Sequence, residues 1–109
     1  MNDTQYQVVF TTCPDAQTAE TIARRLVEDR LAACVNVLPP MWSVYRWRGG
    51  IESAAEQLLI VKIRIADYAA VERCIQNLHP YELPEVIAIP VANGLAAYLS
   101  WLENPDLTE

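Results

Sequence analysis

Apolar residues along this chain change between strand-like and helix-like spacing in one order: strand, helix, strand, strand, helix, strand, helix. This order leaves few ways to build a sheet, because each strand–helix–strand connection should cross over with a right hand. The arrangement that satisfies it is the α+β, ferredoxin-like split βαβ sandwich, with four antiparallel strands and two helices on one face. We expect the third helix to pack at one end of the sheet or on a neighbouring chain.

The first half of this order is read from β-branched runs and one amphipathic stripe. A strand is predicted over residues 6–12 and a helix from about residue 16, with Asp15 as its N-cap. A second strand is predicted over residues 33–48, with a bend or bulge at the Pro39-Pro40 pair that interrupts it. The helix presents a buried stripe of Ala19, Ile22, Ala23, Leu26 and Val27.

A hairpin joins the second strand to the third. Gly49-Gly50 is predicted to form its turn. The third strand is predicted over residues 57–65, with Val61, Ile63 and Ile65 facing inward.

Turn and capping residues delimit the remaining elements. Asp67 is predicted to cap a second helix, which ends at His79-Pro80. A fourth strand follows over residues 86–91, and Asn93 is predicted to cap a short last helix that ends at Asn104-Pro105.

The predicted hairpin is too long for one small chain. A strand over residues 33–48 extends roughly 50 Å, whereas a globule of 109 residues is roughly 34 Å across. Its outer part carries Trp42 and Val44 on one face and Tyr45 and Trp47 on the other. We therefore expect the chain to associate with copies of itself. The alternative is that the proline pair folds the ribbon back onto its own sheet.

Composition excludes several classes of protein. The 109 residues suit one domain, 1–109, and the 52% hydrophobic residues exclude intrinsic disorder. The formal net charge is −6 and the pI about 4.6, so neither nucleic acid nor an anionic membrane surface is expected as a partner.

The cysteines and the N-terminal residues favour a cytoplasmic protein. Cys13, Cys34 and Cys74 are an odd number without CxxC spacing, and in a reducing compartment they are expected to be free thiols. Residues 1–5 lack the basic start of a signal peptide, and no apolar run is long enough for a membrane span.

One candidate site follows from the predicted topology. The first strand and the second helix should end at the same end of the domain, which places Cys13 near the loop that begins at His79. Thiolate and imidazole are ligands for Cu(II) or Zn(II), and Glu82 and Glu85 offer carboxylates, with Asp15 as a further candidate. The structural alternatives are a histidine that ends a helix and a small cysteine in the core.

Other residues leave two interpretations open. Tyr81, Trp42 and Trp47 line a ligand pocket or, more simply, pack an interface. Basic residues of the hairpin strands are expected to be solvated or paired with Glu52 and Glu56 across strands; these are Arg46, Arg48, Lys62 and Arg64. The chain lacks a GxSxG elbow, a glycine-rich phosphate loop and an HExxH motif, so we expect no catalytic residues and no enzyme.

Several sequence blocks resemble the CutA family of divalent-cation tolerance proteins. They are RLAACVNVLP at 30–39, SVYRW at 43–47, ExLxxxK at 56–62, HPYExPEVI at 79–87 and YLxW at 98–101. The resemblance extends from about residue 8 to residue 102. It implies a ferredoxin-like fold, a cytoplasmic homotrimer whose hairpins pair between subunits, and a role in tolerance of copper and other divalent ions.

The resemblance also bears on the site. It implies an architecture similar to trimeric PII-type signalling proteins and direct metal binding near His79 and Glu85. Some members carry a cysteine where this chain has Thr11 and a second histidine where it has Leu78, which weakens the case for tight copper binding.

Three hypotheses result. The first is a non-enzymatic trimer that binds a copper or zinc ion at Cys13, His79 and Glu85, with Glu82 nearby. The second is a PII-like regulatory module that binds a small ligand or a partner protein, with indirect metal effects. The third is an anchoring trimer without a ligand.

Overall fold

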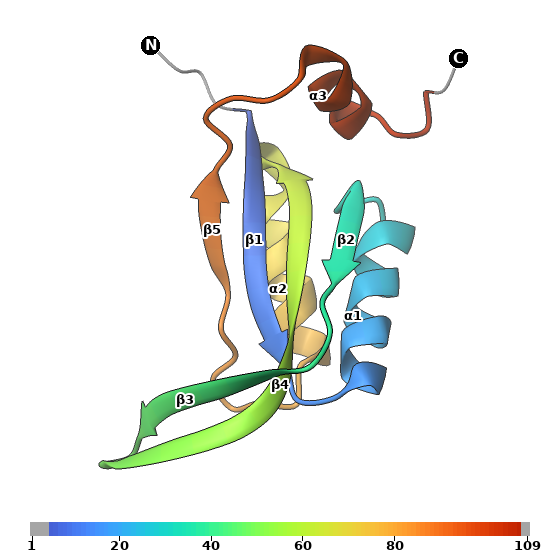
Figure 1. Cartoon of the computed structure of the whole chain (residues 1–109). Helices are drawn as coiled ribbons and strands as arrows, with labels where there is room; N and C mark the ends of the chain where they lie inside the picture. The colour runs from blue at the N-terminus through green and yellow to red at the C-terminus, as the bar shows by residue number, and fades with distance from the viewer. Residues whose placement is uncertain (1–4, 108–109) are drawn as a thin grey trace.

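The computed structural model describes residues 5–107; residues 1–4, which carry most of the signal-peptide prediction, lie outside the described part. Its elements follow the predicted order (Figure 1). They are β1 (Tyr6–Cys13), α1 (Ala16–Glu28), β2 (Cys34–Val37), β3 (Met41–Trp47), β4 (Gly50–Arg64), η1 (Ile65–Asp67), α2 (Tyr68–Leu78), β5 (Ile87–Pro90) and α3 (Ala96–Glu103). Within residues 5–107 no helix has the length and apolar character needed to cross a membrane.

One antiparallel sheet organises the chain. Its strands lie in the order β2-β4-β1-β5, and β3 pairs with the first half of β4. The connections β1-α1-β2 and β4-α2-β5 each pass over one intervening strand, and α1 and α2 lie on the same face of the sheet (Figure 1). The predicted antiparallel sheet with three helices is therefore present.

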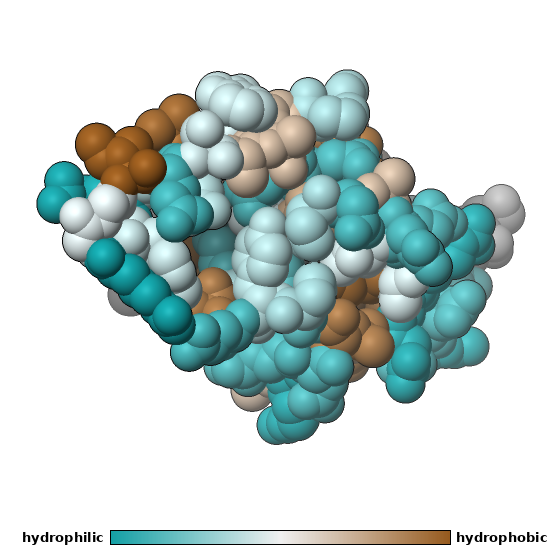
Figure 2. Space-filling model, turned by 90° about the horizontal axis from the view of Figure 1, so that it is seen from below, coloured by the Kyte–Doolittle hydropathy of each residue, from teal (hydrophilic) through white to brown (hydrophobic). Residues whose placement is uncertain are grey.

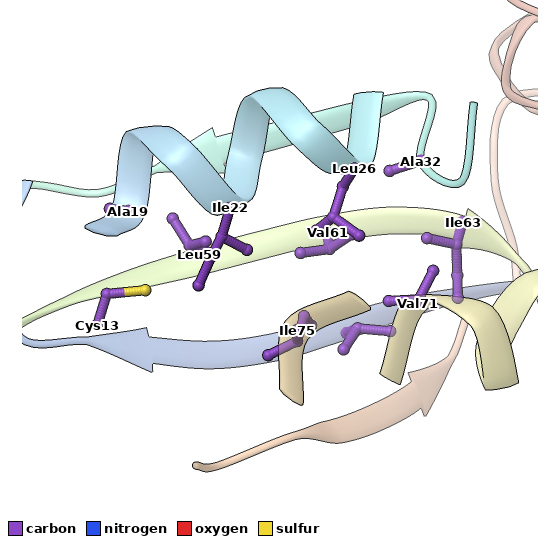
Figure 3. Packing of buried hydrophobic residues seen from close by; sticks show 11 residues of the cluster. Cys13, Ala19, Ile22, Leu26, Ala32, Leu59, Val61, Ile63, Val71 and Ile75 are labelled. Carbon is purple, nitrogen blue, oxygen red and sulfur yellow. The ribbon is translucent and has the colours of Figure 1, made fainter. Parts of the chain in front are cut away.

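The core lies between the two helices and the sheet (Figure 3). Alternate side chains of a strand point to opposite faces. Val9 and Cys13 of β1 consequently share the helix-facing side with the alternating residues of β4. The other contacts of this cluster come from Leu59, Val61 and Ile63 of β4, Ile22 and Leu26 of α1, and Val71 and Ile75 of α2.

Four predicted details are wrong. Val27, expected on the buried stripe of α1, is exposed, because it lies at the edge of the face formed by Ile22 and Leu26. Ile65 is exposed rather than inward, because the strand ends at Arg64 and Ile65 begins the turn η1. The N-cap of the last helix is Leu95 rather than Asn93. Asp67 occupies the N-cap position of α2, but its carboxylate pairs with the Arg64 guanidinium instead of capping the helix.

The strand predicted over residues 33–48 is divided into β2 and β3, and the Pro39-Pro40 pair between them explains the division. The pairing of β2 with β4 ends at Val37↔Leu59, and the pairing of β3 with β4 begins at Met41↔Glu56. Three residues on one strand therefore face two on the other. Such a bulge bends a ribbon and increases its twist, and proline cannot donate to the ladder.

Beyond the bulge the hairpin projects from the sheet as an arm, which we define as β3 with residues 50–56 of β4 (Figure 1). The longest dimension of the chain is 49 Å, so the predicted overshoot is observed. The alternative, a ribbon folded back on its own sheet, is wrong. The turn at the tip consists of Arg48 (φ 49°) and Gly49 (φ 83°) rather than Gly49-Gly50, and positive φ at both positions is typical of a type I′ hairpin.

Candidate functional site

The arm, the end of β1 and the loop of residues 79–86 border an open cavity of about 740 Å³. Thr12 comes from β1, Tyr45 and Trp47 from the inner face of the arm, and Tyr81 and Glu85 from the loop. Figure 2 views the molecule from below and shows the surface hollowed beside the arm. The proline-induced bend makes this space, since a straight ribbon would continue away from the loop.

His79 holds the loop against β1. Its ring Nε2 lies 2.7 Å from the Thr12 carbonyl oxygen, and its Nδ1 accepts a hydrogen bond of 3.1 Å from the Tyr81 backbone N–H. Nδ1 must therefore be the unprotonated nitrogen, and Nε2–H donates to the carbonyl. Both ring nitrogens of this buried histidine are engaged, so a metal ion would have to displace one of these hydrogen bonds.

Cys13 lies in the core and faces the helices rather than the loop (Figure 3). Burial raises the pKa of its thiol to about 11, and the nearby carboxylates of Asp15 and Glu56 act in the same direction. Cys13 is thus enclosed in the core, although the predicted metal site uses it as a ligand beside the loop. Alternation along β1 places Cys13 on the same face as buried Val9 and Thr11.

The two predicted carboxylate ligands lie near the arm but do different things. Glu82 pairs with Arg48, with an Oε1 to Nη2 distance of 2.7 Å. Glu85 lines the cavity, where burial and the charge of Glu56 raise the pKa of its carboxyl. Within residues 5–107 no three histidine, cysteine, aspartate or glutamate side chains are grouped so as to hold a metal ion. Cys13, His79, Glu82 and Glu85 thus share one end of the domain without converging.

Glu56 is the site residue that the sequence did not single out. It is only 8% exposed, and its Oε2 accepts a hydrogen bond of 2.8 Å from the Tyr81 hydroxyl. Burial and this carboxylate raise the pKa of the Tyr81 phenol above its ordinary range. No local signal marks the pair, because Glu56 and Tyr81 are 25 residues apart and meet only through the bend of the arm.

The basic residues of the hairpin strands were expected to be solvated or paired with Glu52 and Glu56 across strands. Arg46 and Arg48 are exposed, and among the ion pairs of residues 5–107 none involves Glu52 or Glu56. Arg48 pairs with Glu82 and lies over the Trp47 ring, 5.1 Å from its centroid. Lys62 lies over the Tyr98 ring instead. Of the aromatic residues proposed for a pocket, Trp47 and Tyr81 line the cavity, whereas Trp42 points away from it.

These positions predict the order of thiol reactivity. At pH 8 a thiol with a pKa near 11 is about 0.1% thiolate, and Cys13 is also shielded. We expect partly exposed Cys34 and Cys74 to react with Ellman's reagent in the folded chain and Cys13 to react only after unfolding. Mass spectrometry of labelled peptides identifies the sites. Early labelling of Cys13 would contradict its placement in the core.

The whole chain resembles proteins already described. The sequence model of the family described as CutA1 divalent ion tolerance protein matches residues 7–105. Divalent-cation tolerance protein CutA of Thermus thermophilus is 45% identical over 98 residues, which are 90% of this chain and 95% of that protein. Protein CutA of Mus musculus is 45% identical over 95 residues, 87% of this chain, but the chain spans only 54% of that relative's length.

The structural comparison agrees with the sequence comparison. The crystal structure of CutA from Xylella fastidiosa superposes with a TM-score of 0.88 at 45% identity, covering 91% of this chain and 95% of that one. The resemblance in sequence therefore extends to the arrangement of the sheet and helices. The chain belongs to the CutA1 family of divalent ion tolerance proteins.

Proposed function

We propose that this chain acts in divalent-cation tolerance as a non-enzymatic, cytoplasmic homotrimer of ferredoxin-like subunits that binds neither nucleic acid nor membranes. The strand order β2-β4-β1-β5 with both crossover helices on one face supports the ferredoxin-like assignment. The observation that carries the assembly is the apolar surface of the arm. Trp42, Val44 and Ile51 of its outer face are 70%, 64% and 74% exposed.

A second apolar surface supports the same proposal. The sheet face opposite α1 and α2, here called the open face, carries Val8, Phe10, Leu58, Ile60, Ile87 and Ile89. α3 packs at one end of this face, where the Lys62 ammonium lies over the Tyr98 ring. Contiguous apolar surface of this kind marks a protein interface. The stoichiometry of three comes from the resemblance to the CutA family.

A more specific version of this proposal is that the chain itself binds copper or zinc. Glu82 and Glu85 are accessible to an ion, whereas Cys13 is enclosed and His79 already uses both ring nitrogens. We therefore expect Cu²⁺ and Zn²⁺ to bind no more tightly than micromolar. In titration calorimetry Glu85→Gln should weaken binding and Cys13→Ser should leave it unchanged.

The matched control for this titration is Glu28→Gln, an exposed carboxylate on α1 far from the loop. His79→Ala tests the first hypothesis, in which the ion binds at Cys13, His79 and Glu85. Nanomolar binding that is lost in both His79→Ala and Cys13→Ser would restore the predicted Cys13, His79 and Glu85 site and contradict the geometric argument.

The second hypothesis, a PII-like module that holds a small ligand, gains support from one observation. The cavity between the arm and the 79–86 loop is of the size that small ligands occupy and is lined by aromatic and carboxylate side chains. In this form the cation effect is indirect, and the cavity is the ligand site.

A further inference from the structure

The cavity contains negative charge that the chain does not neutralise. Glu52, Glu56, Glu82 and Glu85 all line it. Among the ion pairs of residues 5–107, only Glu82 has a basic partner, Arg48. Of the four, Glu56 is buried, whereas Glu52, Glu82 and Glu85 are exposed at the edge of the cavity. A buried carboxylate without a positive partner loses hydration without compensation, and a bound cation would offset that loss.

Among these four carboxylates, Glu56 gives the strongest indication of a cation site, because its residue is more than nine-tenths buried. Within the described chain, its side chain receives one hydrogen bond, from the Tyr81 hydroxyl to Oε2. A carboxylate has two oxygens and about four acceptor positions. Glu56 therefore faces the cavity with acceptor capacity that no described residue uses. Burial raises the pKa of the neighbouring Glu85 carboxyl, and the charge of Glu56 acts in the same direction.

The rim of the cavity already shows how a cation is held there. The Arg48 guanidinium lies 5.1 Å from the centroid of the Trp47 ring and binds Glu82 at 2.7 Å. An aromatic face and a carboxylate together bind an organic cation more strongly than either alone. Tyr45 and Tyr81 offer further rings to the same cavity, and the Tyr81 hydroxyl lies against Glu56.

Size and spacing favour an organic cation over a bare metal ion. About 740 Å³ is far more than one ion and its ligands require and lies in the range of small-molecule sites. The carboxylates do not form a three-ligand group, so they suit several separate positive charges better than one. Apolar and aromatic side chains that also line the cavity, including Met41 and Trp47, suit a methylene chain.

We propose that this cavity binds an aliphatic diamine or polyamine, with its ammonium groups on Glu56, Glu85 and Glu52 and its methylene chain along Tyr45, Trp47 and Tyr81. This amine site rests on the second form of the proposed function, the ligand-binding module, because it names the class of ligand that the module holds.

The test is titration calorimetry of the full chain, in its native assembly, with 1,4-diaminobutane and spermidine. We expect both amines to bind at one site per chain, with affinity that falls as salt is added. The uncharged isostere 1,4-butanediol should not bind. Glu56→Gln retains the shape and the acceptor for Tyr81 but removes the charge, and should weaken amine binding about tenfold.

Two further variants separate a site from general attraction to an acidic protein. Glu28→Gln removes an equal charge on α1 and should leave the affinity unchanged. Glu85→Gln changes an exposed position, where a substitution costs little stability, and should weaken binding several-fold even if Glu56→Gln fails to fold. Equal loss in Glu28→Gln and Glu85→Gln, equal binding of the diol, or no amine binding at millimolar concentration would overturn the proposal.

These outcomes are separable from those of the proposed function. A trimer in sedimentation that responds to Cu²⁺ but ignores amines would reject the amine site and leave the proposed function intact. A single chain that still binds diamines in a manner dependent on Glu56 and Glu85 would reject the assembly and retain the site.

Discussion

Charging the outer face of the arm is expected to separate the assembly into single chains. The double substitution Trp42→Glu, Val44→Glu places two carboxylates where the structure leaves two large apolar side chains exposed. Burying each of these side chains at an interface contributes about 1.5–3 kcal/mol. Their loss alone should weaken each contact between chains about a hundredfold or more, and burial of the new charges weakens it further.

Sedimentation equilibrium at micromolar concentration measures this effect directly. The unmodified chain should sediment as three copies of the 12.3 kDa protomer and the double variant as one. Val27→Glu is the matched control, because Val27 is also an exposed valine but lies on α1, away from the arm and the open face. An unmodified chain that is monomeric at this concentration, or a double variant that keeps the mass of the assembly, would refute the proposal.

Truncating the centre of the core is expected to cost the chain much of its stability. Leu59 is fully buried on the helix-facing side of β4, the strand that pairs with β1, β2 and β3. Leu59→Ala should lower the free energy of unfolding by about 2–5 kcal/mol, since the lost burial adds to the cost of the cavity that remains. The total free energy of unfolding of a small domain is only about 5–15 kcal/mol.

Urea denaturation at one fixed protomer concentration measures the change, because assembly makes stability depend on concentration. Leu83→Ala is the control: it makes the same truncation at a leucine of the 79–86 loop that is largely exposed. Its expected effect is below about 0.5 kcal/mol. A similar cost for both variants would show that β4 is not the centre of the core.

The arrangement of elements was largely predictable from residue spacing. Helical stripes such as Ile22 and Leu26, and strand alternation such as Val61 and Ile63, repeat at the period of the element that they form. Boundaries were predicted less well, at Ile65 and Asn93, since end residues depend on single hydrogen bonds rather than on a repeated pattern.

The sequence predicted where the candidate site lies but not how its side chains are oriented. The topology correctly brought the end of β1 to the 79–86 loop, as the contact between His79 and Thr12 shows. It did not show that Cys13 faces the core or that both nitrogens of His79 are engaged. Those properties depend on side-chain direction and on contacts between residues 67 positions apart in the chain.

Residue order by itself therefore determined the family, the sequence of elements and the excessive length of the hairpin, because these properties arise from local spacing and chain dimensions. The tertiary structure alone decided what the hairpin encloses. The bulge at the proline pair turns the arm beneath the 79–86 loop, so that Glu56 meets Tyr81 and a cavity forms between them. Such a meeting depends on the angle of one bend, which no periodicity in the chain encodes.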